Sequence, residues 1–410
     1  MKVLTPQQLS TTFGSLPTLV PRVVVSGNMA TPSSLVGILD ANIESYRLFS
    51  INACSALPDR ADVTHESPFI GPALRAIGRF SYLPMRLSMV PALFRSTRHP
   101  DVVLVSCSPP RGRKVSLGIE VNIVVAAIEA ARERGALVVA QINSSIPYLA
   151  GDGEIDLDQI DLAVEIDEPL PSARPRPVSD ADREIGRHVV SLVGDGATLQ
   201  IGIGAVPDAV AAELVGRRGL KVRSEAVSDG IMQLDQAGAL DQDVPIIASF
   251  LIGSSELYDW AASSGRVLMQ RTETVNDPGQ IAAVTAMTSI NTAFEIDLYA
   301  QSVASYRLGT IYSGLGGQPD FTTGAMHSRG GQAIIALPSW HGPRDASRVI
   351  PVATTPVSSF QHSAIVTDQG IAPIFGHSQR AQARLLISQA ADPRARDELW
   401  AQAGRLGLTD

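Results

Sequence analysis

The stretch DVVLV at residues 101–105, followed by a helical segment over 120–134 and by ALVVA at 136–140, decides the fold class. Both apolar runs are continuous, which is typical of parallel strands covered on both faces. The segment between them has helical spacing and composition, and Gly135 ends it. Strand, helix and strand in this order predict a crossover unit in a parallel sheet. RVVV at 22–25 predicts a further strand.

The same alternation restarts in the second half of the chain. A predicted helix over 179–192 precedes the apolar strand ATLQI at 197–201. A glycine turn then leads into a second predicted helix over 208–215 and a short strand at 220–222. The second half therefore has the same kind of architecture as the first.

The stretch EPLPSARPR at 168–176 separates the two halves. Four prolines fall within residues 169–177, too many for a helix or a central strand. A chain of 410 residues is also too long for one ordinary core. We therefore predict an α/β protein with two open, mainly parallel domains of similar size, over residues 1–172 and 179–410.

The composition argues against several functional classes. The chain has a formal net charge of -8 and 5% aromatic residues, so it repels phosphate backbones and offers few stacking platforms. The histidines lack metal-binding spacing, and no G-K-[ST] sequence marks a phosphate-binding P-loop. We expect no nucleic-acid partner and no metal.

The N-terminus and the hydropathy of the chain predict its compartment. MKVLTPQQLS lacks the basic flank and apolar core of a signal peptide. No uninterrupted apolar stretch reaches the roughly 18 residues of a membrane span. Cys54 and Cys107 form no C-x-x-C pair, and we interpret both as buried small side chains. A cytoplasmic protein without a membrane partner is expected.

Two glycine-rich segments and one carboxylate form the candidate site. GDGATLQIGIGAVPDA (194–209) predicts a turn whose backbone N–H groups would point at an anion or oxyanion. Glu225, in SEAVSDG (224–230), falls at a predicted strand end, where doubly wound sheets bind ligands. SGLGGQPDF (313–321) offers further backbone donors. Alone, each loop also fits an ordinary turn, and Glu225 also fits a first-turn acid of a helix.

Together these blocks resemble the acetyl-CoA hydrolase/transferase family, which includes acetate-type and 4-hydroxybutyrate-type CoA-transferases. The resemblance covers nearly the whole chain. Further blocks that carry it are SCSPPRGRKVSLG (106–118), QINSSIPYLAGD (141–152), VEIDEP (164–169), Asn276-Asp277-Pro278, SINTAFEIDL (289–298) and SRVIP (347–351). Chance agreement at this density is implausible.

The resemblance implies a CoA-transferase that moves CoA between an acyl-CoA and a free carboxylic acid. Glu225 occupies the position of the family's nucleophile, which would form a glutamyl-CoA thioester in a ping-pong reaction. CoA would be a substrate rather than a permanently bound cofactor, and the family analogy favours a homodimer. The residues expected to contact CoA are Gly202, Ile203, Gly204, Ala205, Val206, Gly314, Gly316, Gly317 and Gln332.

Several positions depart from the family pattern. Arg223 stands where the family usually has His, and Gln332 where it often has Lys. Asp368, which replaces a longer acid, is the second catalytic candidate, because that acid would orient the nucleophile or a bound carboxylate. With Phe375 in place of a charged residue, a less polar wall would favour apolar acyl groups over succinyl groups. Alternatively, both side chains only pack behind the site and leave selectivity unchanged.

Two other functions stay open at this point. Water in place of a carboxylate would make the protein an acyl-CoA hydrolase. A degenerate homologue would bind CoA without turnover, and the altered residues around Asp368 are compatible with that alternative. The sequence does not name the acyl group or the acceptor acid.

Overall fold

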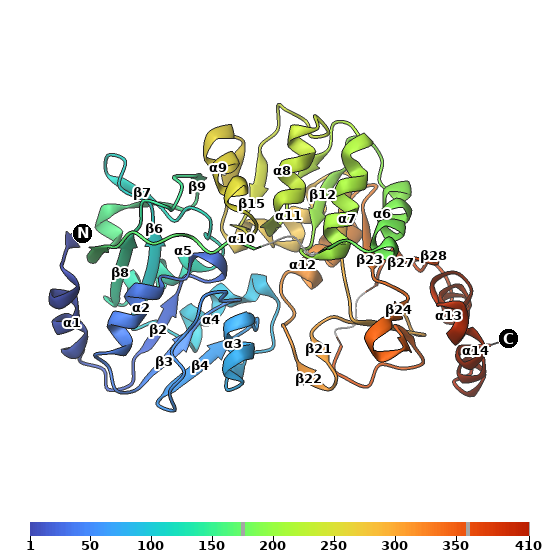
Figure 1. The fold of residues 1–410 in the computed structure, drawn as a ribbon, viewed down its shortest axis with the longest axis horizontal. Coiled ribbons are helices and arrows are strands. Elements are labelled where there is room, and N and C mark those ends of the chain that lie inside the picture. The colour runs from blue at the N-terminus through green and yellow to red at the C-terminus, as the bar shows by residue number, and fades with distance from the viewer. Residues whose placement is uncertain (174–176, 358–360, 410) are drawn as a thin grey trace. The chain divides into compact units, whose positions relative to one another are not determined.

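The computed structural model describes residues 1–173, 177–357 and 361–409. The chain divides into two compact units, drawn in Figure 1. Unit 1 comprises Met1–Ala173 and Ile246–Val275, and unit 2 comprises Arg174–Pro245 and Asn276–Asp410. Residues 174–176 of the predicted linker lie outside the described residues.

Unit 1 is built on an eight-stranded sheet in the order β1-β11-β8-β6-β2-β3-β4-β5. All neighbouring strands in it are parallel, as the continuous apolar runs predicted. The strands are β1 (Lys2–Val3), β2 (Arg22–Val25), β3 (Tyr46–Phe49), β4 (Val63–Ser67), β5 (Ser81–Tyr82), β6 (Val102–Cys107), β8 (Leu137–Ile142) and β11 (Leu162–Glu165).

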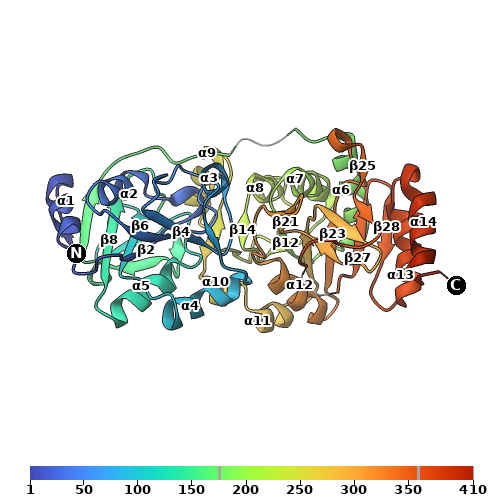
Figure 2. The same cartoon turned by 90° about the horizontal axis from the view of Figure 1, so that it is seen from below.

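The predicted strand–helix–strand unit is present in unit 1. Helix α5 (Val124–Glu133) connects β6 to β8, which pair in parallel. Gly135 follows the helix with a φ of 66°, a conformation that favours glycine. Figure 2 shows α4 (Val90–Ser96) and α5 on one face of the sheet and α2 (Ser33–Asp40) and α3 (Pro72–Ile77) on the other. Helix α1 (Pro6–Gly14) contacts α2.

The segment Ile246–Val275 packs with unit 1, whereas the predicted division places it in the second domain. It forms β15 (Ile246–Ala248), β16 (Phe250–Leu251), α9 (Ser255–Ser264), β17 (Val267–Met269) and α10 (Thr272–Val275). Strand β17 pairs in parallel with β9 (Ala150–Gly151). Arg271 forms a two-pronged ion pair with Glu129 of α5, with both N–O distances 2.7 Å. These long-range contacts anchor the segment.

Unit 2 is built on a six-stranded sheet in the order β13-β12-β18-β23-β27-β28. The strands are parallel except for the last pair, β27 and β28, which form an antiparallel hairpin. Their bounds are β12 (Thr198–Ile201), β13 (Lys221–Val222), β18 (Met287–Asn291), β23 (Gln332–Ala336), β27 (Ala364–Thr367) and β28 (Gly370–Pro373). The predicted mainly parallel α/β class is confirmed in both units.

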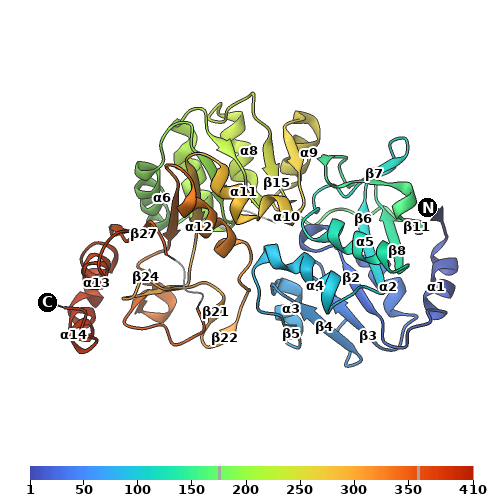
Figure 3. The same ribbon diagram turned by 180° about the vertical axis from the view of Figure 1, so that it is seen from behind.

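Helices cover both faces of the sheet in unit 2. Figure 2 shows α6 (Asp180–Leu192), α7 (Ala205–Glu213) and α8 (Asp229–Gln236) on one face, and α11 (Pro278–Ala283) and α12 (Gln318–His327) on the other. Helices α11 and α12 contact each other, and α12 packs on β18 and β23 (Figure 3). This packing fixes the start of α12 near the carboxyl ends of the strands.

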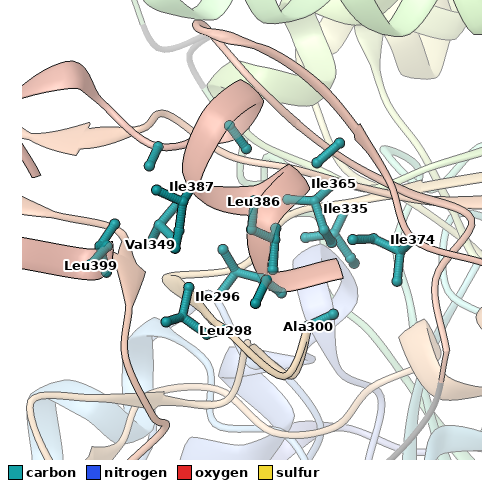
Figure 4. Packing of buried hydrophobic residues seen from close by; sticks show 14 of the residues in the cluster. Ile296, Leu298, Ala300, Ile335, Val349, Ile365, Ile374, Leu386, Ile387 and Leu399 are labelled. Carbon is teal, nitrogen blue, oxygen red and sulfur yellow. The ribbon is translucent and has the colours of Figure 1, made fainter. Parts of the chain in front are cut away.

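A separate hydrophobic cluster joins the C-terminal part of unit 2 to its sheet (Figure 4). Ile335 and Ile365 contribute from the sheet, and Ile296 contributes from β19 (Glu295–Asp297). Leu386 and Leu399 come from the segment that contains α13 (Gln379–Leu385) and α14 (Arg396–Arg405). All five side chains are at most 3% exposed, so this cluster holds the C-terminal helices in place.

Candidate active site

Glu225 lies just beyond the carboxyl end of β13, before the short strand β14 (Ala226–Val227). The preceding residue, Ser224, is buried, and its hydroxyl donates a hydrogen bond to the carbonyl of Ile201, 3.4 Å away. Ile201 is the last residue of β12, so the Glu225 segment is tied to the edge of the sheet where the glycine turn begins. Helix α8 begins only at Asp229, so Glu225 is not an acid in its first turn.

The carboxylate of Glu225 accepts hydrogen bonds from two donors. The side-chain amide of Asn276 donates to Oε2 over 2.9 Å, and the backbone N–H of Gly317 also donates to the carboxylate. Asn276 is fully buried, and Gly317 is the N-cap residue of α12. The negative group is therefore held at the positive end of α12.

Gly317 is the point of closest approach to the nucleophile candidate. A Cβ atom at this position would lie 1.8 Å from Oε2 of Glu225 and 2.3 Å from Nδ2 of Asn276. No side chain fits there without displacing one of these groups. Gly316 beside it has a φ of 57°, and Gly314, Gly316 and Gly317 are all buried. The second glycine loop thus brings its backbone directly to the carboxylate.

The surroundings of Glu225 oppose its ionisation. Burial raises the pKa of Glu225 to about 7, and the negative charge of Asp320 acts in the same direction. The hydrogen bonds from Asn276 and Gly317 lower the pKa but do not cancel the effect of burial. In the unliganded site, both protonation states of Glu225 are therefore populated near neutral pH.

The raised pKa of Glu225 predicts a pH-dependent gain of stability in Glu225→Gln. Above the ordinary glutamate value of 4.5, the unfolded chain loses this proton while the folded chain retains it up to about pH 7. Glu225 therefore destabilises the folded protein more and more as the pH rises through this interval. The free energy of unfolding of the variant relative to the native protein should rise by about 3 kcal/mol between pH 4.5 and pH 8.

Urea titrations at pH 4.5, 6 and 8 measure this difference. Glu398→Gln, which changes an exposed glutamate of α14 in the same way, is the matched control and should show no such trend. A stability difference for Glu225→Gln that is constant across the three pH values would contradict the prediction.

The predicted turn of Gly202–Val206 connects β12 to α7. The N–H of Gly202 donates to the carbonyl of Ile290 over 3.0 Å, which continues the sheet ladder by one residue. Gly204 is the N-cap residue of α7 and has a φ of 122°, which requires glycine. Ile203 is 41% exposed, whereas Val206 is buried. Ala205 is the first residue of the helix, so all five predicted residues lie on one turn at the helix start.

A closed network of polar side chains lies under this turn. Gln200 accepts hydrogen bonds from the Ser289 hydroxyl over 2.6 Å and from the Asn291 amide over 2.9 Å. Gln200 in turn donates to the Asn291 carbonyl oxygen over 3.1 Å. A Cβ atom on Gly202 would lie 3.6 Å from this Asn291 oxygen, so the turn rests on the network. These side chains make the end of the sheet rigid.

Two of the predicted site residues, Gln332 and Asp368, form hydrogen bonds with other parts of unit 2 and not with Glu225. Gln332 lies at the amino end of β23, the opposite end from Glu225, and its amide donates to the carbonyl of Leu192 over 2.8 Å. Asp368 follows β27 and accepts from the backbone N–H and the hydroxyl of Ser339 over 2.6 and 3.0 Å. Asp368 thereby fixes the loop that follows β23.

The other departures from the family pattern have defined positions in unit 2. Arg223 donates to Oε1 of Gln280 in α11 over 3.3 Å, and burial lowers the pKa of its guanidinium. Phe375 is 64% exposed. The preference for apolar acyl groups that was inferred from Asp368 and Phe375 stays a prediction.

Within residues 1–173, 177–357 and 361–409, no group of three or more His, Cys, Asp or Glu side chains is placed to hold a metal ion. No helix in this described part of the chain is long and apolar enough to cross a membrane.

Comparison with known proteins gives matches over nearly the whole chain. The profile of the acetyl-CoA hydrolase/transferase N-terminal domain matches residues 22–173, and that of the C-terminal domain matches residues 253–403. The chain is 35% identical to 4-hydroxybutyrate coenzyme A transferase from Clostridium kluyveri, over 92% of each chain. It is also 35% identical to succinyl-CoA:acetate/propanoyl-CoA:succinate CoA transferase from Fasciola hepatica, over 92% of this chain and 83% of that one.

Solved structures show the same fold. RipA from Yersinia pestis superposes with a TM-score of 0.92 at 26% identity, covering 99% of this chain and 98% of RipA. A more distant sequence relative is an acetyl-CoA hydrolase from Kluyveromyces lactis, which is 28% identical over 67% of this chain and 57% of the hydrolase.

Proposed function

The chain belongs to the acetyl-CoA hydrolase/transferase family, and we propose that it transfers CoA between an acyl-CoA and a free carboxylic acid with Glu225 as the nucleophile. The observation that carries this proposal is the carboxylate of Glu225 held by Asn276 and Gly317 at the start of α12. The two relatives at 35% identity, whose names describe CoA-transferases, support the reaction class.

The reaction begins with attack of a Glu225 oxygen on the thioester carbonyl of the acyl-CoA. A C–O bond forms and the C–S bond breaks, which gives a mixed anhydride and the CoA thiolate. The thiolate then attacks the glutamyl carbonyl and expels the first carboxylate. A second carboxylic acid reverses the two steps, so the thioester's free energy is carried through covalent intermediates rather than lost to water.

The Asn276 amide on Oε2 assigns different roles to the two carboxylate oxygens. Because Asn276 donates to Oε2, Oε1 is assigned as the oxygen that attacks. When the thiolate attacks the glutamyl carbonyl, negative charge develops on Oε2. Asn276 would then stabilise the oxyanion without rearrangement.

The glycine turn Gly202–Val206 supports CoA binding in this proposal. Its start is adjacent to the Glu225 segment through the Ser224–Ile201 hydrogen bond, and it presents the N-terminus of the nine-residue helix α7. Gly314, Gly316 and Gly317 would border the thioester. Asp368, which binds Ser339, is proposed to position the loop after β23 rather than to contact CoA.

Hydrolysis is the second candidate function, favoured by the acetyl-CoA hydrolase among the relatives. The two reactions share the glutamyl intermediate and differ in the acceptor that resolves it. A CoA-binding protein without turnover is the third candidate. The retained Glu225 with its two donors argues against this third candidate.

A labelled-acid exchange assay distinguishes the three functions. The protein is incubated with acetyl-CoA and 14C-propionate, and labelled propionyl-CoA and free thiol are measured separately. Transfer gives labelled thioester, hydrolysis gives thiol release that does not depend on the acid, and a non-catalytic protein gives neither. Labelled thioester at no more than the rate without protein would refute the proposal.

The pH dependence of transfer should reflect ionisation of Glu225. Only the carboxylate form attacks, so kcat/KM should fall as the pH decreases below the pKa of about 7 in the free protein. At pH 6, a group of this pKa is about one-tenth ionised, and kcat/KM should be about tenfold below its plateau. Initial rates between pH 5 and pH 9 measure the profile. A plateau that extends unchanged to pH 5 would contradict the assignment.

We also propose that the protein is a cytoplasmic homodimer, an expectation that rests on family analogy and on the prevalence of two-fold dimers. Light scattering tests the oligomeric state, because a species at the chain mass of 43.4 kDa alone would exclude the dimer.

A further inference from the structure

Asn276, the side chain that donates to Glu225, carries a second polar atom that has no partner in the described chain. The residue is 0% exposed. Its Nδ2 donates to Oε2 of Glu225 over 2.9 Å, whereas its Oδ1 has no hydrogen-bond partner within residues 1–173, 177–357 and 361–409. Buried amide oxygens in folded proteins are usually paired, and an unpaired one costs free energy. This oxygen is therefore a candidate contact for a ligand.

The carboxylate of Glu225 fixes the direction of the Asn276 amide. An ionised carboxylate only accepts hydrogen bonds, so Nδ2 rather than Oδ1 must face Oε2. The backbone at Gly317 also lies against Nδ2, because a Cβ there would be 2.3 Å from that atom. Oδ1 is bonded to the same carbon as Nδ2, so it lies one carboxamide away from the reacting group. A ligand atom that pairs with Oδ1 must therefore be close to the atom bonded to Glu225 during the reaction.

The reactants of CoA transfer offer few donors for this oxygen. Simple carboxylic acids react as carboxylates, which have no N–H or O–H group, and the thioester group has none either. In the pantetheine arm of CoA, an amide N–H is separated from the sulfur by two methylene groups. When the sulfur is bonded to the carbonyl carbon of Glu225, this N–H is the nearest donor that CoA can offer to Asn276.

We propose that Asn276 also contacts CoA: its Oδ1 accepts a hydrogen bond from the pantetheine N–H nearest to the sulfur. This inference rests on the proposed function and adds a substrate contact to the oxyanion donor. The contact holds the thiolate beside the glutamyl carbonyl after the C–S bond breaks, so that the thiolate attacks before CoA leaves. Pairing at Oδ1 also polarises the amide, which strengthens the hydrogen bond from Nδ2 to Oε2.

Two small thioesters isolate the effect of this N–H. S-acetyl-N-acetylcysteamine keeps the amide nearest to the sulfur, and its ketone isostere has a methylene group in place of the N–H. Each thioester should transfer its thiol to Glu225 with release of acetate, and mass spectrometry measures the second-order rate constant of this step. In the native protein, the amide thioester should react about tenfold faster, because the isostere leaves Oδ1 unpaired. Equal rate constants, or an adduct from neither thioester in a protein that reacts with acetyl-CoA, would overturn the inference.

Asn276→Ala tests whether Asn276 is the residue that distinguishes the two thioesters. The variant loses the oxyanion donor, so both rate constants should fall, but their ratio should also drop from about ten to about one. If Asn276 serves only to hold Glu225, both rate constants fall and the ratio stays near ten, which would refute the contact. If Asn276→Ala does not fold, the ratio in the native protein decides.

Asn42→Ala is the matched control for the loss of an asparagine side chain. Asn42 is partly exposed and donates to the carbonyl of Ile38 in α2. Its substitution should change neither the two rate constants nor their ratio.

Failure of the proposed function gives a different result. If acetyl-CoA leaves no CoA adduct on Glu225 in the native protein, the nucleophile assignment fails and the contact fails with it. If the CoA adduct forms and the two small thioesters react equally fast, only the contact between Asn276 and the pantetheine amide is refuted.

Discussion

Glu225→Ala is expected to lower kcat/KM for CoA transfer by at least about 10⁴-fold, because it removes the atom that forms the covalent bond. Glu225→Asp keeps the charge but withdraws the carboxylate by one methylene from Asn276 and Gly317. A displacement of about 1 Å at a reacting atom costs about 10²-fold, so the aspartate variant should retain weak activity. A kcat/KM that decreases from the native protein to Glu225→Asp and further to Glu225→Ala would identify Glu225 as the nucleophile.

The intermediate itself can be observed. Incubation of the native protein with acetyl-CoA should add CoA to the peptide that contains Glu225, and borohydride should reduce this thioester and inactivate the protein. Glu398→Ala is the control for loss of a glutamate elsewhere in unit 2. Wild-type transfer by Glu225→Ala, or an adduct on another peptide, would remove Glu225 from the mechanism.

The parallel sheets were predictable because the pattern that specifies them is local. The run 22–25 corresponds exactly in extent to β2, and the runs at 101–105 and 136–140 correspond to β6 and β8 within two residues at each end. After a charged first residue in two of them, Arg22 and Asp101, the runs are apolar because helices cover both faces of the sheet. The position of Ile246–Val275 was not predictable, because its partners, such as Glu129 and β9, lie more than 100 residues earlier in the chain.

In the candidate site too, residues within a sequence motif were predictable, whereas contacts between distant segments were not. The family blocks identified Glu225 and Gly317, but they assigned no role to Asn276, which is 51 residues from Glu225 in the chain. Asn276 lies just before α11, which packs against α12, so the contact depends on long-range packing. Asp320 lies in the segment SGLGGQPDF (313–321), and the family pattern likewise assigned no role to it.

Gln332 is close to Gly317 in the sequence but lies at the other end of the sheet. It follows Gly317 by fifteen residues, but helix α12 runs between them (Figure 3). The chain then enters β23 at its amino end, where Gln332 pairs in register with Thr288. Because α12 returns the chain from the carboxyl edge of the sheet to the amino edge, Gln332 is far along the strand direction from the glycine loop that precedes the helix.

Gly317→Ala is expected to abolish most of the transfer activity without removing any side chain. Its Cβ would lie 1.8 Å from Oε2 of Glu225 and 2.3 Å from Nδ2 of Asn276, so at least one of them must move by more than 1 Å. Either movement breaks the 2.9 Å hydrogen bond between these two groups. Displacement of the nucleophile and loss of an oxyanion donor each cost about 10²-fold, so kcat/KM should fall by about 10³-fold or more.

The same kinetic assay with Gly342→Ala is the matched control, because a Cβ at Gly342 meets nothing within 4 Å and should leave kcat/KM within about twofold of the native value. Gly317→Ala should keep a cooperative thermal transition, since the clash involves polar side chains that can rotate rather than the hydrophobic core. The CoA adduct on Glu225 should be lost together with the activity, because attack itself is impaired. Native activity in a folded Gly317→Ala protein would show that the close backbone approach to Glu225 is not needed for catalysis.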